Sequence, residues 1–477
     1  MNFLSWQFVG FYAITYLFFW ATPGNEAKKW MLIAASYFFY GAWDWRFNGL
    51  MLGVTLNAFA AGWALERYAS QRRLILVASI ATSLGVLVFF KYATFLYSNL
   101  ATVGQLVCGL ESTWCAGWSP LFLIILPVGI SFYTFHAISY TVDIYRWRIS
   151  GRRSFADVAL YIAFFPILVA GPIVRASTLM PQLARESRFW RAQQISGLRL
   201  FAIGVVYKIV ADTLAPYCDP IFADAPRFST DPVQTLDGIL AFYGQIYFDF
   251  AGYSGMAIGI ARTLGYRIPR NFNFPYRSAS VTEFWRRWHI SLSSWLRDYL
   301  YIPLGGSRAG VGRQLLNLMI VMVLGGLWHG ASWTFVIWGG LHGLGLSLHK
   351  IWLLFRPRRL GWLWQSPFWW CVGVLVTQIW VIVAWIFFRA TSFGDAIAFI
   401  SSVFRYPEAV NGRFSAFWIV VLILVWVDIV CGGRGRRSWT MIGVPGRLIF
   451  WSAMGALFAL ALFVSPTTHK QFIYFNF

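Results

Sequence analysis

The chain has 477 residues, of which 58% are hydrophobic and only 12% are charged. Soluble proteins carry about 25% charged residues, so this composition excludes a soluble globular protein. It indicates a membrane protein with many spans, because only lipid tolerates this much apolar surface. The formal net charge is +21. Since the basic residues gather in loops between apolar segments, the positive-inside rule accounts for the excess, and we expect no nucleic-acid partner.

Apolar segments that could cross a bilayer recur along the whole chain. They lie near residues 3–21, 30–43, 47–64, 74–98, 119–140, 196–215, 236–264, 314–328, 331–348, 368–388, 415–431 and 448–465. The sequence therefore predicts an all-α polytopic membrane protein with about 11 to 13 transmembrane helices. We expect a single membrane domain over residues 1–477, with N-terminal spans at 1–118, a catalytic core at 119–348 and C-terminal spans at 349–477.

Segment 155–175 is apolar, yet the loops on both sides of it are basic. A single crossing would place one of these basic loops outside, against the positive-inside rule. Pro166 and the Gly171-Pro172 pair also interrupt a straight helix. We therefore interpret the segment as a re-entrant element, which must be buried in protein or line a cavity. With this choice both chain ends face outside.

The region 271–306 has the densest set of polar and aromatic residues. Ser280 and Glu283 have the spacing of a capping box, which predicts a helix start. Apolar residues then recur at steps of three or four on one helix face. They are Trp285, Trp288, Leu292, Trp295 and Tyr299. An amphipathic helix at the membrane interface is the simplest interpretation.

Three further residues of this region are candidates for function. Arg286 and Arg287 lie off the aromatic face, where they would attract a phosphate-bearing substrate. His289 follows Trp288 near the aromatic face, so we expect its ring to point inward.

His329 lies between two short apolar arms, at the expected tip of a hairpin within the membrane. An ionisable group at that depth is costly, so it is a functional candidate. A structural histidine bonded to a neighbouring helix is the equally weighted alternative. Gly325, Gly326 and Gly330 allow close helix packing or close approach of a substrate. His342 follows on the next span, where we expect it to pack.

Asp249 is a lone acid in an apolar span, and an acid within the membrane needs a partner. An Arg or His from another helix is the structural alternative. Orientation of a catalytic histidine is the functional one. At the chain end, FIYFNF contains Tyr474, whose hydroxyl can form a covalent intermediate, although docking at the interface explains the hexapeptide as well. We interpret His136 as a packing residue.

The sequence is identified as resembling the membrane-bound O-acyltransferase family over roughly residues 120–345. The motifs that carry the resemblance are WRRWHISLSSWLRDYLYIPLGG and LGGLWHGASWTFVIWGGLHG, supported by PVGISFYTFHAISYTVDIYR, FFPILVAGPIVR and YFDFAGYSGMAIG. The bacterial branch of alginate O-acetylase membrane subunits is the most similar, and D-alanyl-lipoteichoic acid transporter-like proteins are more distant.

The resemblance implies that His329 is the family's catalytic histidine and His289 its second signature polar residue. It implies a tunnel from a cytoplasmic donor site to an outer acceptor site. Asp298 and Asp249 match recurring acids of the family. The candidates for substrate binding are these two acids together with Arg286, Arg287, Trp285 and Trp288. The sequence departs from the family where an acid is expected at Gly255 and a glutamine at His136. The ending is similar to that of polysaccharide-acetylating members, where a terminal tyrosine relays the acyl group.

We therefore expect acetyl transfer from cytoplasmic acetyl-CoA, a substrate rather than a bound cofactor, and no metal. His329 is the expected general base, assisted or oriented by His289, because a buried neutral imidazole suits that task. The acceptor is Tyr474 or a hydroxyl on a partner. Implied partners are membrane lipid, a periplasmic acetyltransferase and an exopolysaccharide, with alginate the leading candidate and cellulose or peptidoglycan as others. A bacterial inner-membrane location follows. A transporter and a non-catalytic scaffold are the alternatives.

Overall fold

The computed structural model describes residues 2–108, 125–151, 154–357 and 366–405, and over these residues the regular structure is helical without strands. The α-helices are α1 (Trp6–Ala21), α2 (Asn25–Asp44), α3 (Arg46–Arg67), α4 (Arg72–Cys108), α6 (Ile130–Tyr145), α7 (Phe155–Ala163), α8 (Phe165–Leu168), α9 (Ala176–Leu183), α10 (Arg191–Ala223), α11 (Ala225–Phe228), α12 (Pro232–Thr263), α13 (Val281–Arg287), α14 (Ile290–Leu296), α15 (Gly310–His329), α16 (Trp333–Phe355), α18 (Pro367–Arg389) and α19 (Phe393–Val403). Two short 3₁₀ turns, η1 (Ala69–Gln71) and η2 (Pro275–Arg277), and one π-helical segment, η3 (Arg297–Tyr301), complete the regular elements of the described residues.

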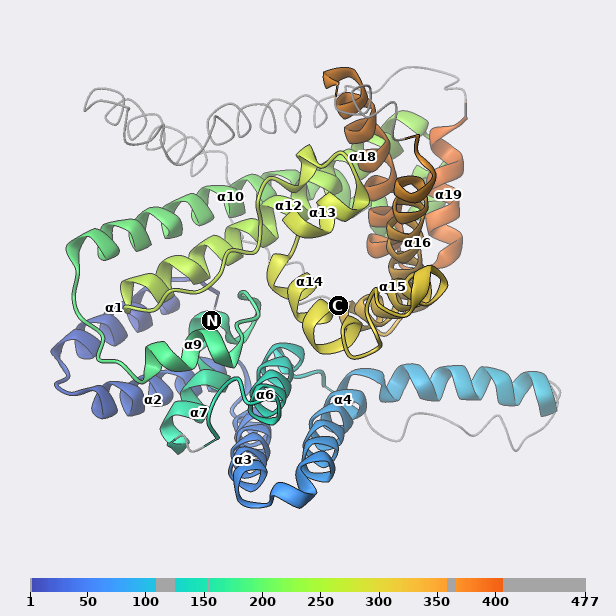
Figure 1. Ribbon diagram of the computed structural model, residues 1–477. Coiled ribbons are helices and arrows are strands. Elements are labelled where there is room, and N and C mark those ends of the chain that lie inside the picture. The colour runs from blue at the N-terminus through green and yellow to red at the C-terminus, as the bar shows by residue number, and fades with distance from the viewer. Residues whose placement is uncertain (1, 109–124, 152–153, 358–365, 406–477) are drawn as a thin grey trace.

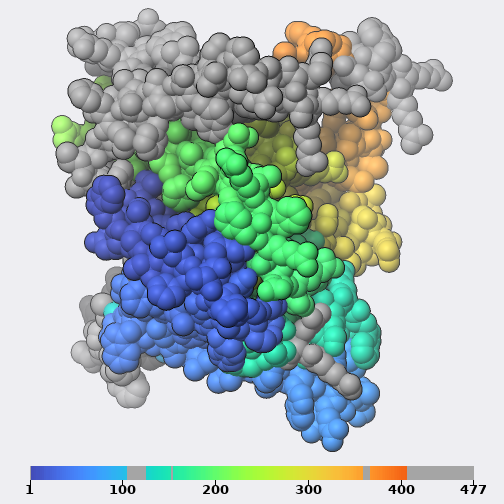
Figure 2. All heavy atoms as spheres, turned by 90° about the vertical axis from the view of Figure 1, so that its left-hand side faces the viewer, coloured from blue at the N-terminus to red at the C-terminus, as the bar shows by residue number. Residues whose placement is uncertain are grey.

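Three groups of helices make up the described part of the molecule (Figure 1). Helices α10 and α12 lie side by side as a long pair, and α15, α16, α18 and α19 gather on one side of it. The N-terminal helices pack with α6, α7 and α9. Figure 2 shows α1 and α2 (blue) beside the green segment that contains α9, where Asn25 donates from Nδ2 to the carbonyl of Leu183 at 2.9 Å.

Glycines bring α10 and α12 into backbone contact. A Cβ added at Gly204 would lie 2.6 Å from the carbonyl oxygen of Gly252, and one at Gly259 would lie 2.6 Å from that of Gly197. Small residues at such steps are a common means of close helix packing in membranes. The same packing leaves little room at Gly255, where a Cβ would lie 3.3 Å from Gly204. A glycine in place of the expected acid at this position therefore fits the close contact between α10 and α12.

Some described helices present large apolar side chains outward. Trp6, Leu17 and Phe18 on α1 are 88%, 66% and 62% exposed, as expected for a lipid-facing surface. Three helical stretches, Ala69–Gly104, Gly310–His329 and Pro367–Arg389, are long and apolar enough to cross a membrane. The expected spans at 415–431 and 448–465 lie outside the described residues.

Two predicted elements are tested directly. The break expected within 155–175 is present, because α7 ends at Ala163, α8 is one turn long, and residues 156–174 are buried throughout. The predicted start of the apolar helix over 119–140 was wrong. Helix α6 begins only at Ile130, after Gly129 at φ 78°, a left-handed backbone conformation that glycine adopts without strain.

Helices α15 and α16 form the expected hairpin, and two adjacent glycines of α16 test its packing. A Cβ at Gly339 would collide with the carbonyl oxygen of Met322 on α15, whereas one at Gly340 meets nothing within 4 Å. We expect Gly339→Ala to destabilise the protein by about 1–3 kcal/mol through overpacking. Gly340→Ala should be neutral or slightly stabilising. Thermal unfolding of both variants in the same detergent measures the difference, and equal melting temperatures would contradict this packing.

Candidate active site

In the described part of the chain, two clusters of buried hydrophobic residues meet at the predicted histidines. Trp328 and Leu292 belong to the first cluster, and Trp288 and Trp338 belong to the second. His289 stands between Trp288 and Leu292 in the chain, and His329 follows Trp328 directly. Both histidines are buried, at 0% and 4% exposure. The fold therefore brings the two predicted catalytic residues to one internal boundary.

The helix predicted from Ser280 onward starts as expected but is not continuous. Ser280 Oγ accepts from the amide of Glu283 at 3.2 Å, while Glu283 reaches back to the amide of Ala279 at 2.9 Å. The interpretation as one interfacial amphipathic helix was wrong, because the chain breaks at His289, where φ is 40°. A non-glycine residue in this region is strained and is typical of functional sites.

Sequence reasoning missed the residue that holds this turn in place. The carbonyl of Asn271 accepts from the amide of Ile290 at 2.8 Å, and its side chain accepts from Ser291 Oγ at 2.5 Å and donates to Ser254 Oγ at 3.0 Å. Ser291 Oγ also accepts from the amide of Ile173 in the buried segment between α8 and α9, at 2.9 Å. All three polar side chains are buried. An isolated asparagine in a loop gave no periodic signal that could reveal this role.

The imidazoles of His289 and His329 face each other across an aromatic cage. Their ring centroids are 6.4 Å apart. Phe250 packs edge-on to His289 at 4.6 Å, and Trp338 and Phe388 pack edge-on to His329 at 4.9 and 5.3 Å. Neither ring nitrogen of His289 has a hydrogen-bond partner among the described residues. A buried imidazole without a partner requires an explanation, and binding a reacting group supplies one.

A pocket of about 100 Å³ adjoins His329. Its walls are Lys91 of α4, Trp328 and His329 of α15, Val169, and residues 126–132 at the start of α6. The site therefore has one wall from the end of α15 and another from the first turn of α6.

The predicted tryptophans are buried and pack around the histidines. Trp285 and Trp288 are 7% and 1% exposed, so they are core residues rather than interfacial ones. Trp285 donates from Nε1 to Nδ1 of His342 at 3.2 Å, and Trp338 lies between His342 and His329, 4.8 and 4.9 Å from their rings. His342 therefore packs as expected.

The predicted arginines lie at the outer surface of α13. Arg286 is exposed, and Arg287 pairs with Glu283 at 2.8 Å and donates to the carbonyl of Asn273 at 3.1 Å. Arg287 therefore helps to hold the segment around Asn273 against α13, close to the turn at His289.

Asp249 has a buried cation as its partner, although not the expected Arg or His. Lys208 Nζ lies 2.8 Å from Asp249 and 2.7 Å from Asp212, and each of the three side chains is at most 3% exposed. The network joins α10 to α12. Asp249 is thus part of an ion-pair network between two helices, with a lysine as its cation.

Lys208→Met should destabilise the protein strongly, because it leaves two buried carboxylates without their cation. Breaking a buried ion pair costs about 3–5 kcal/mol. Thermal unfolding in detergent measures the loss. A triple variant that adds Asp212→Asn and Asp249→Asn removes the uncompensated charges and should recover part of the stability. An unchanged melting temperature in Lys208→Met would show that the network does not stabilise the α10–α12 pair.

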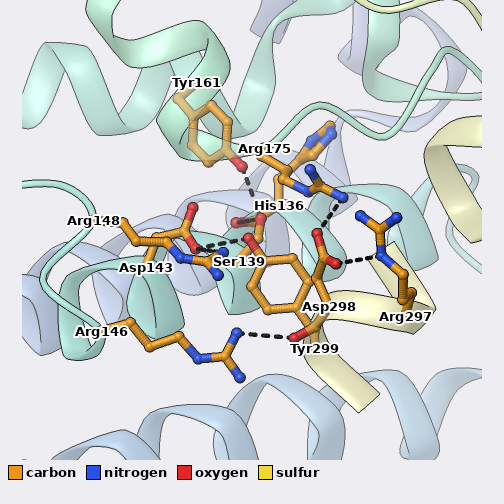
Figure 3. Close-up of polar contacts among 10 residues, drawn as sticks. All are labelled: His136, Ser139, Asp143, Arg146, Arg148, Tyr161, Arg175, Arg297, Asp298 and Tyr299. Carbon is orange, nitrogen blue, oxygen red and sulfur yellow. Dashed lines mark hydrogen bonds and ion pairs between the residues drawn. The ribbon is translucent and has the colours of Figure 1, made fainter. Parts of the chain in front are cut away.

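Asp298 lies in the polar cluster that Figure 3 shows. This cluster is near the C-terminal end of α6, whereas the pocket beside His329 is at the N-terminal end of that helix. Its carboxylate pairs with Arg175 at 2.5 Å and with Arg297 at 2.7 Å, and its carbonyl accepts from Arg146 at 2.9 Å. The next residue, Tyr299, donates to Asp143 of α6 at 2.8 Å. Asp298 therefore ties η3 to α6 and to the segment before α9.

The same cluster includes His136 and explains its packing role. His136 Nε2 accepts from the amide of Val174 at 3.2 Å, and Tyr161 donates to the carbonyl of Val174 at 2.9 Å. Burial raises the pKa of Tyr299 above its ordinary value, with the Asp143 carboxylate adding to the effect, so this phenol stays a donor. Tyr474 lies outside the described residues.

Comparison with known proteins agrees with this architecture. The sequence pattern of the membrane-bound O-acyltransferase family matches residues 145–385, which include both histidines. A probable alginate O-acetylase of Pseudomonas aeruginosa is 38% identical over 91% of this chain and 81% of its own length. A peptidoglycan O-acetyltransferase of Helicobacter pylori is 36% identical over 82% and 76%. A teichoic acid D-alanyltransferase of Bacillus subtilis is 27% identical over 47% and 58%.

Proposed function

This chain belongs to the membrane-bound O-acyltransferase family, and from that premise we propose that it passes acetyl groups from cytoplasmic acetyl-CoA across the membrane for O-acetylation of an exported polysaccharide. Acyl transfer to oxygen is the activity of the family. The donor, the route and the acceptor are the parts that we propose.

The observation that carries the proposal is the pair of buried imidazoles in the aromatic cage. The ring centroids of His289 and His329 are 6.4 Å apart, so the two imidazoles are close enough to contact the same reacting group. General-base catalysis requires an imidazole within hydrogen-bond reach of the proton that it removes. His329 is the base, because it also borders the pocket. His289 binds or orients the same group from the opposite side.

The step itself is transfer of an acyl group from sulfur to oxygen. The acceptor hydroxyl gives its proton to His329 as its oxygen attacks the thioester carbonyl. The carbon–sulfur bond then breaks, and the leaving thiolate takes the proton from the imidazolium. The acceptor is Tyr474 as a covalent relay or a hydroxyl on a partner.

The identity of the polymer rests on the relatives. Proteins named as probable alginate O-acetylases are 35–38% identical to this chain over most of its length, so alginate or a related exopolysaccharide is the proposed acceptor. The peptidoglycan O-acetyltransferase of Helicobacter pylori makes peptidoglycan the main competitor. We propose a location in the bacterial inner membrane, with a periplasmic acetyltransferase as the partner that completes the transfer.

The test uses membranes that contain the full chain and acetyl-CoA labelled in the acetyl group. Mass spectrometry follows the label in the C-terminal peptide of the native protein, of His329→Ala and of Tyr474→Phe. Label in the native peptide that is lost in both variants supports acetyl transfer with a tyrosine relay. Consumption of the donor without label in the peptide supports acyl transfer but excludes Tyr474 as a covalent relay. Intact donor in every sample, with the periplasmic partner added, contradicts acetyl-CoA as the substrate and favours a scaffold or a transporter.

A further inference from the structure

The pocket beside His329 contains a cation that the acyl-transfer step described above does not use. Lys91 of α4 lines this pocket with His329. Its Nζ lies 2.5 Å from the carbonyl oxygen of Trp328 and 2.9 Å from that of His329. Lys91 and His329 are 238 residues apart in the sequence, so only the fold reveals their contact.

Lys91 and Tyr92 cap the C-terminal end of α15. The last carbonyls of a helix have no partner within the helix. Here Tyr92 donates to the carbonyl of Leu327 at 2.6 Å, and Lys91 donates to the two carbonyls that follow. A cation also suits the negative end of a helix dipole. The pair therefore fixes the turn that carries His329.

Among the described residues, the hydrogen bonds of Lys91 leave one of its N–H donors for the pocket. A lysine ammonium has three N–H donors, and the two carbonyls of α15 take two of them. The opposite wall is the first turn of α6, a helix of 16 residues that begins after Gly129. Its N-terminal amides form the positive end of that helix dipole. A negative charge that forms in the pocket would thus meet an ammonium on one side and a helix N-terminus on the other.

We propose that Lys91 is a catalytic residue that binds the carbonyl oxygen of the acyl group and stabilises the oxyanion formed during transfer. This inference rests on the proposed acyl transfer. When the acceptor oxygen attacks the thioester, the carbonyl electron pair moves to the carbonyl oxygen, and Lys91 donates its third N–H to that oxygen. When the pair returns, the carbon–sulfur bond breaks and the thiolate leaves. A donor aimed at an oxyanion typically contributes about 10²–10³ in kcat.

Lys91→Gln separates charge from capping, because an amide still donates to the carbonyls of α15 but carries no charge. We expect its kcat to fall by about 10²–10³ while the KM for the donor changes by less than about threefold. Lys91→Arg keeps the cation and should retain at least about a tenth of the native kcat. The assay is CoA release by the full chain in nanodiscs, with thermal unfolding measured for each variant.

Tyr92→Phe is the matched control, because it removes the neighbouring cap on Leu327 and leaves the pocket cation in place. A folded Lys91→Gln variant with native kcat would overturn the inference. Equal losses of kcat in Lys91→Gln and Tyr92→Phe would also overturn it, because they would show that Lys91 acts only as a helix cap. If Lys91→Gln does not fold, a Lys91→Arg variant that folds but loses kcat as completely as His329→Ala would overturn it as well. If the native protein releases no CoA, the proposed acetyl transfer fails instead.

Discussion

His329→Ala abolishes acyl transfer, with an expected loss in kcat of about 10³-fold or more, because the general base is removed. Initial rates of CoA release from acetyl-CoA measure the loss in purified protein in nanodiscs. His329→Gln is the second variant, since glutamine fills more of the aromatic cage around Trp338 and Phe388 and limits any loss of packing.

The control for this prediction is a histidine on the same helical hairpin. His349 of α16 forms a hydrogen bond through Nδ1 with Thr282 at 2.8 Å. It does not line the pocket beside His329. His349→Gln should keep the native rate. A His329→Ala variant that unfolds at the native temperature and transfers acyl groups at the native rate would exclude His329 as the base.

His289→Asn lowers kcat by about 10–100-fold and leaves the fold intact. Asparagine tolerates the left-handed backbone conformation of this position, where φ is 40°, better than most residues. The variant therefore removes the imidazole without adding backbone strain. The same rate assay and a melting curve measure the two effects separately.

His289→Val is the matched variant for the backbone. A β-branched residue with positive φ is strained by roughly 1–2 kcal/mol, so we expect His289→Val to be less stable than His289→Asn and equally slow. A His289→Asn variant with the native rate would show that this imidazole takes no part in the reaction.

The sequence predicted the parts of the fold that depend on local patterns. The hairpin that places His329 at its tip, the capped start of the helix at Ser280 and the break after α7 all follow from glycine, proline and capping signals. The family resemblance over residues 120–345 also located both histidines. These signals depend on residues close together in the chain, which a single sequence displays.

The rest depends on contacts between distant segments. The break at His289 is held by Asn271, which pairs with residues 290 and 291 only after the chain has turned back on itself. An uninterrupted aromatic repeat hid that break. Lys91 meets His329 through the packing of α4 on α15, and the cation beside Asp249 comes from α10. None of these partners has a fixed spacing from the residue that it serves.

The central claim is that His289 and His329 act on one reacting group, and a double-mutant cycle tests it most directly. Rates of acyl transfer are measured for the native protein, His289→Asn, His329→Ala and the double variant. Residues that act as a unit give strongly non-additive losses. We predict that the double variant is no slower than His329→Ala alone. Losses that multiply, so that the double variant is slower by the full product of the two, would contradict a shared site.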